Sequence, residues 1–277
     1  MCVQQTDVTA AIDVASLNTL FQTPIFVLHY YFYAISPVSL IATSTATIIS
    51  SALPFYLLRP LSAPHSLPAL GNVKQRTYTG LHLRNRIIIS DTTTTIALVL
   101  LAAIVFASTL QFSLLRFLPR FFILHFAGLR DLSWAYTVAE TWPRLLVWLL
   151  PAGLASVQFL FRPSEGAVPQ TPTLAPEASG ANSVPLHRYP SGHFDPVTAG
   201  FWQHVYHNVW GWYGTRQREL IGRTFTLGFL LVAETTVSIF CSMAGVEWIG
   251  AAGYAGIWYA GIIVLGAMLY WIGAPSD

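Results

Sequence analysis

The sequence predicts an all-α integral membrane protein, a polytopic helix bundle with five membrane spans. Its 277 residues include only 14 basic and 12 acidic ones, or 9% charged, where a typical soluble domain has about 25%. Hydrophobic residues make up 54%, and the mean hydropathy is +0.54. A soluble domain of this length would expose too much apolar surface. Long runs with few or no charges, of the length that crosses a ~30 Å hydrocarbon core, complete the evidence.

Five such runs are the expected spans, and each carries at most one charged residue: 38–58, 92–115, 145–161, 224–246 and 249–272. The run 145–161 is the shortest, and Pro151 interrupts it. A sixth span before Pro37 is compatible with the sequence. Its polar and helix-breaking residues Asn18, Gln22 and Pro24 argue against it. The aromatic residues at 26–33 suit an interfacial segment or the lower part of one long tilted helix.

The spans divide the chain into two membrane portions, 1–161 and 200–277. Between them, residues 162–199 contain seven prolines in 38 residues and predict a flexible linker. Residues 116–129, with Arg116 and Arg120 one turn apart, predict a segment that lies in the interface.

Basic residues are unevenly shared between the two sides of the predicted bundle. Loops 59–90 and 162–223 carry five each, and 116–144 carries four. Because cytosolic loops are enriched in Lys and Arg, we expect 59–90 and 162–223 on the cytosolic side. Five spans then leave the N-terminus outside, and six bring it to the cytosolic side.

Residues 201–213 predict an amphipathic helix with an aromatic face. Arginines follow this helix, directly before the fourth span begins. A helix of this kind lies in the membrane interface, with arginines near anionic headgroups. It is either a lipid-sensing or partner-docking element or an ordinary helix packed on its own bundle. The candidate interface residues are Phe201, Trp202, Tyr206, Trp210, Trp212, Arg216, Arg218 and Arg223.

The polar face of the same helix carries His204 and His207. Two histidines at this spacing can share a metal ion, but a site needs further ligands, for example His193 or Asp195. Two solvated histidines are the simpler interpretation. We expect no metal, no other cofactor and no catalytic residue.

Glu234 is the acid that lies deep in a span. An ionisable residue in the bilayer centre costs about 3 kcal/mol on insertion scales and marks a candidate functional site. Helical spacing places it with Ser238, Cys241 and Gly245, a small and weakly polar stripe expected to face protein or water. Glu234 is either a proton or cation relay or a structural acid bonded to a neighbouring helix.

The last span carries small residues at four-residue spacing, Ala252, Gly256 and Ala260. Such a stripe lets another helix approach closely. The expected partner is the fourth span, because the turn between them is short. Association with a second copy of the chain is the alternative.

The stretch from Phe194 to Thr224 contains the run His204 to Tyr213 and then Arg216 to Arg223. It resembles a segment of uncharacterised multi-pass membrane proteins of filamentous fungi, as does the ending Gly273 to Asp277. The resemblance covers the C-terminal third. It implies a eukaryotic internal membrane and carries no activity or site residue.

The sequence favours a non-enzymatic membrane protein that organises or docks other components or is a complex subunit. Its partners would be the lipid bilayer and another membrane protein or a second copy of the chain, and no nucleic acid. One alternative is a small transporter or channel that uses a buried Glu234. Another is a membrane enzyme that uses His204 and His207.

Overall fold

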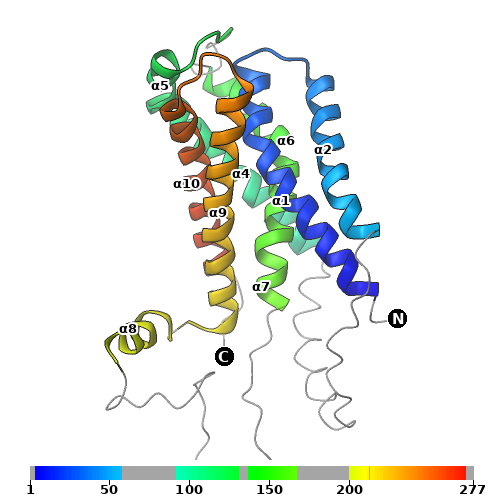
Figure 1. Cartoon of the computed structure of the whole chain (residues 1–277), viewed down its shortest axis with the longest axis vertical. Helices are drawn as coiled ribbons and strands as arrows, with labels where there is room; N and C mark the ends of the chain where they lie inside the picture. Colours follow the sequence, from blue (N-terminus) through cyan, green and yellow to red (C-terminus); the bar gives the residue numbers. More distant parts are fainter. Residues whose placement is uncertain (1–3, 58–91, 131–136, 167–199, 212, 273–277) are drawn as a thin grey trace, which may run out of the picture.

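The computed structural model describes residues 4–57, 92–130, 137–166, 200–211 and 213–272, and these form an all-α bundle (Figure 1). The predicted linker, from residue 167 on, and the loop 59–90 lie outside the described residues. The helices are α1 (Gln4–Tyr31), α2 (Pro37–Leu57), α4 (Thr92–Arg116), α5 (Leu118–His125), α6 (Val138–Ser156), the π-helical turn η2 (Val157–Phe161), α7 (Arg162–Gly166), α8 (Phe201–Trp210), α9 (Thr215–Ser242) and α10 (Trp248–Ile272).

Six helical segments are long and apolar enough to cross a membrane: Ala11–Tyr31, Pro37–Leu57, Thr92–Arg116, Glu140–Ser164, Arg216–Ser242 and Trp248–Ile272. Three of them match the predicted spans at 38–58, 92–115 and 249–272 to within one residue. The short run at 145–161 is part of a longer crossing, because α6 continues through η2 into α7. The predicted interfacial stretch 116–129 contains the short helix α5.

The N-terminal segment is a full helix, so the preference for five spans is wrong and the sixth span is present among the candidates. The structure shows how its unfavourable residues are accommodated. The amide of Asn18 donates to the hydroxyl of Ser51 on α2. The hydroxyl of Tyr254 on α10 donates to the carbonyl of Pro24 at 2.8 Å. Both contacts come from other helices, and polar groups satisfied in this way can lie within a membrane.

Five of the spans form a closed ring in which each contacts the next, in the order α1, α9, α10, α4, α6 and back to α1. The second span, α2, lies outside the ring against α1 (Figure 1). At one end of the bundle, the α8 end, α1, α4 and α9 begin and α2, α7 and α10 finish. The opposite end carries α5 and is called the α5 end.

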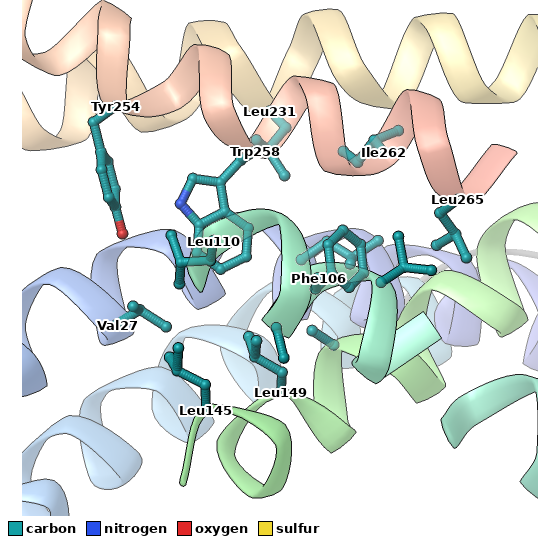
Figure 2. Packing of buried hydrophobic residues seen from close by; sticks show 14 of the residues in the cluster. Val27, Phe106, Leu110, Leu145, Leu149, Leu231, Tyr254, Trp258, Ile262 and Leu265 are labelled. Carbon is teal, nitrogen blue, oxygen red and sulfur yellow. The ribbon is translucent and has the colours of Figure 1, made fainter. Parts of the chain in front are cut away.

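Apolar side chains from every helix of the ring fill its centre (Figure 2). Phe106 of α4 packs against Trp258 of α10, with ring centroids 6.1 Å apart. Leu145 and Leu149 of α6 and Val27 of α1 close the opposite side of the same cluster. The interior of the described bundle is therefore a packed apolar core.

The α5 end is closed by backbone contacts between the segment after α5 and the turn from α9 to α10. Phe126 and Val246 form an isolated antiparallel bridge. His125 Nδ1 lies 2.7 Å from a carboxylate oxygen of Glu247. The hydroxyl of Tyr33 donates to the carbonyl of Ala127 at 3.2 Å, and partial burial raises the pKa of this hydroxyl. These contacts fix the short connections at this end.

Candidate functional site

Glu234 lies on the exposed outer surface of α9, away from the core of the ring. It precedes the end of α9 at Ser242 by eight residues (242 − 234), which at ~1.5 Å per residue is ~12 Å inside the helix end. The hydroxyl of Ser238, one turn further along, donates to its Oε1 at 3.1 Å. A carboxyl group therefore faces the region that lipid would occupy around a single chain.

Hydroxyl groups on the outer surface of α2 provide a contrast. Exposed residues such as Thr43, Thr45 and Thr47 donate to backbone carbonyls three or four residues earlier, at 2.7–3.0 Å. Their polarity is satisfied within their own helix. An ionised carboxylate has no equivalent arrangement, because it only accepts hydrogen bonds and cannot donate to a helix carbonyl. Glu234 is thus a different kind of surface group from the α2 hydroxyls.

The stripe that contains Glu234 is divided between the core and the outer surface. Leu231 and Leu227, one and two turns before the acid, are fully buried in the ring. Cys241 and Gly245, on the other side of the acid, are exposed. The sequence expected Ser238, Cys241 and Gly245 to face protein or water. In the single chain Cys241 is uncovered, Ser238 is half-buried, and Gly245 lies in the turn after α9 against Ala127.

The small-residue stripe on α10 is open at Gly256, where the expected close approach of α9 is not found. Gly256 and Ala260 are exposed, Ala252 is half-buried, and no atom lies within 4 Å of a Cβ built at Gly256. The close approach of α9 and α10 uses other glycines. Gly228 lies against the ring of Tyr259, and Gly266 lies against Thr224.

The predicted amphipathic helix 201–213 is shorter in the structure, where α8 ends at Trp210 and α9 begins at Thr215. Phe201 and Trp202 are exposed on α8, and Trp210 is half-buried. Trp212 and the side chains of Tyr206 and His207 lie outside the described part of the structure. Within that part, no group of three His, Cys, Asp or Glu residues is placed to hold a metal ion.

Arginines gather where α9 begins. Arg223 Nε donates to Glu219 Oε1 at 2.6 Å, and its Nη1 lies 3.9 Å from a carboxylate oxygen of Asp13 on α1. The same Nη1 donates to the carbonyl of Phe159 in η2 at 3.3 Å, and the guanidinium lies 5.3 Å from the Phe159 ring centroid. Arg223 thereby joins α1, α9 and the π-helical turn.

The other two arginines of this group bond to backbone carbonyls. Arg216 Nη2 donates to Leu269 of α10 at 3.3 Å. Arg218 Nη2 donates to Gly211 at 3.2 Å, which ties the start of α9 to the turn after α8. All three predicted interface arginines, Arg216, Arg218 and Arg223, therefore make contacts within the bundle at its α8 end.

The fold and the six apolar helices define this chain as a multi-pass membrane protein with an all-α bundle. Comparison with protein-family models, with curated proteins and with solved structures finds no match for it.

Proposed function

We propose that this protein is a non-enzymatic subunit or organiser of a membrane-protein assembly, in which a helix of another chain covers the Glu234 surface of α9. The position of Glu234 carries the proposal. A carboxyl group exposed ~12 Å inside the end of a spanning helix costs about 3 kcal/mol on insertion scales if lipid surrounds it. A partner helix with a hydrogen-bond donor would remove that cost.

The same position argues against the transport alternative. A coupling acid has to line a path through the bundle, whereas Glu234 lies outside a core of packed apolar side chains. The covering helix belongs to a second copy of this chain or to another membrane protein, and the experiment below distinguishes the two.

The proposal includes the orientation of the bundle. In the six-span arrangement, α2 ends and α4 begins at the α8 end, and α7 ends and α9 begins there too. The segments 59–90 and 162–223 carry ten basic residues in total against four in 116–144. The positive-inside rule then supports a cytosolic α8 end. The resemblance to fungal membrane proteins supports a eukaryotic internal membrane.

The test is purification of the full chain from its native membranes in mild detergent, as wild type, Glu234→Leu and Glu234→Gln. The mass and composition of the particle would be measured by native electrophoresis and mass spectrometry. We expect a particle larger than one chain for the wild type. Glu234→Leu should release the partner, and Glu234→Gln should weaken its retention less, because an amide keeps its hydrogen-bonding capacity.

Thr45→Val is the matched control, because it also removes an exposed intramembrane polar group, but one that is bonded within its own helix. It should leave the particle unchanged. Co-purification of two differently tagged copies identifies a homo-oligomer, and a stoichiometric second protein identifies a mixed complex. A wild-type chain that purifies as a monomer, or a Glu234→Leu chain that keeps its partner, would refute the proposal.

A further inference from the structure

A groove of about 330 Å³ lies between α9 and α10 at the α8 end of the bundle. Its walls include Ile221 and Phe225 from α9 and Ile263 and Ala267 from α10. At the floor of the groove α9 and α10 are in close contact, because Gly266 lies against Thr224. The small residues of α10 leave space on the outer side of that contact. The groove is thus apolar, and it lies on the outer surface of the bundle at one end of α9 and α10.

Aromatic residues mark the level of the groove relative to the membrane. Tyr213 precedes α9, Trp271 is the penultimate residue of α10, and both line the groove. Trp271 is 86% exposed. Tyr and Trp concentrate at the level of lipid headgroups, with the ring toward the acyl chains and the polar atom toward water. The groove therefore begins at the headgroup level and continues toward the acyl-chain region.

Arg218 lies at the headgroup end of the same helix face. Ile221 and Phe225 follow it by three and seven residues, the spacing that places side chains on one face of a helix. Its Nη2 donates to the carbonyl of Gly211, but its buried Nε has no hydrogen-bond partner. Among the described residues, no carboxylate pairs with it.

The pairing of Arg223 makes the difference between these two arginines clear. Arg223 has Glu219 and Asp13 within ion-pair distance, so its charge is balanced inside the protein. The charge of Arg218 is not balanced in this way. Arg218 does not line the groove itself, but it precedes Ile221 by one turn on the same face of α9. Its unbalanced charge is complementary to an anionic phosphate attached to an acyl chain in the groove.

We propose that the groove between α9 and α10 binds one anionic phospholipid, with an acyl chain against Ile221, Phe225, Ile263 and Ala267 and its phosphate on Arg218. An acyl chain gains little hydrophobic free energy on moving from the bilayer into an apolar groove, because lipid tails are as apolar as the groove. Selectivity for the headgroup therefore comes from Arg218, and the groove fixes where the lipid lies. This site is independent of the Glu234 surface.

The experiment is native mass spectrometry of the full chain in detergent micelles that contain equal amounts of phosphatidylcholine and phosphatidylglycerol with the same acyl chains. The wild type should retain one lipid and prefer phosphatidylglycerol. Arg218→Gln should reduce that preference about fivefold, the equivalent of about 1 kcal/mol for one arginine near an anionic surface. Arg218→Lys should largely keep it. Ala267→Phe fills the groove and should reduce retention of both lipids.

Two control variants match these changes. Arg120→Gln removes an exposed arginine at the α5 end, and Ala233→Phe adds the same ring at an exposed position of α9 outside the groove. Both should behave as the wild type. The proposal is overturned if Arg218→Gln keeps the full preference, if Ala267→Phe retains lipid as the wild type does, or if inorganic phosphate abolishes the preference. The last result would identify a site for a soluble anion. Because Ala267→Phe leaves Arg218 in place, the groove is tested even if Arg218→Gln does not fold.

Discussion

Replacement of Gly153 by alanine should destabilise the bundle, because Gly153 is where α6 and α4 approach most tightly. A Cβ atom at Gly153 would lie 2.6 Å from the carbonyl oxygen of Val99 and 3.2 Å from the backbone nitrogen of Ala103. Both are backbone atoms, so no side-chain rotation relieves the overlap, and the two helices have to separate. Overpacking of this kind costs about 1–3 kcal/mol.

Gly256→Ala provides the matched comparison, since the same methyl group is added to a spanning helix at a position with no atom within 4 Å. Alanine is favoured over glycine in a helix interior by about 1 kcal/mol, so this variant should equal or exceed the wild type. Because the propensity gain is common to both variants, they should differ by the overpacking cost, about 1–3 kcal/mol in the free energy of unfolding. Denaturation in SDS and mild detergent, followed by circular dichroism, measures the difference. If Gly153→Ala is as stable as Gly256→Ala, the inferred contact between α6 and α4 is wrong.

Two further substitutions test contacts between the helices of the ring by the same denaturation assay. Arg223→Gln leaves the carboxylates of Asp13 and Glu219 without their cation and should lower the free energy of unfolding by about 1–2 kcal/mol, because the site is partly exposed. An unchanged midpoint would mean that the three-way contact of Arg223 contributes nothing to stability. Tyr254→Phe keeps the buried ring but removes the hydrogen bond to the carbonyl of Pro24, which should cost about 1 kcal/mol. Equal stability of this variant and the wild type would show that α1 and α10 are held by apolar packing alone.

The spanning helices could be predicted from the sequence where a charge or a proline marks each boundary. Asp91 precedes α4 and Arg116 ends it, and Pro37 begins α2. A charged residue in the hydrocarbon layer is costly, so a charge at the edge of an apolar run marks the limit of a span from the local sequence.

The first span could not be predicted in this way, because its acceptability depends on other helices. Asn18 and Pro24 are unfavourable in an isolated spanning helix. Ser51 of α2 and Tyr254 of α10 satisfy their polar groups only after the bundle has formed. Analysis of one segment at a time detects the unfavourable residues, but it does not detect the residues on other helices that bond to them.

The candidate site shows the same limit. The sequence placed Glu234 in a run long enough to span a membrane, and the structure places it on the exposed surface of α9. Spacing alone did not separate Leu227 and Leu231, which pack in the core, from Glu234, because this separation depends on how α9 is rotated against its neighbours. Gly256 shows the same limit, because small residues permit a close contact but the side chains of the neighbouring helix decide where it forms.

The isolated position of α2 has a consequence for how the chain crosses the membrane. Leu40 is its one buried residue, and α1 is its contact in the bundle. Because α1 belongs to the ring and runs from the α8 end to the α5 end, the chain must return before α4 can begin at the α8 end. The α2 helix is the return crossing. Its sequence has to be apolar enough to cross and free of charge, but it has to fit one neighbour, α1, rather than several. We therefore expect the positions of α2 that face away from α1 to tolerate exchange for other uncharged residues more widely than the helices of the ring, which accounts for a span rich in serine and threonine.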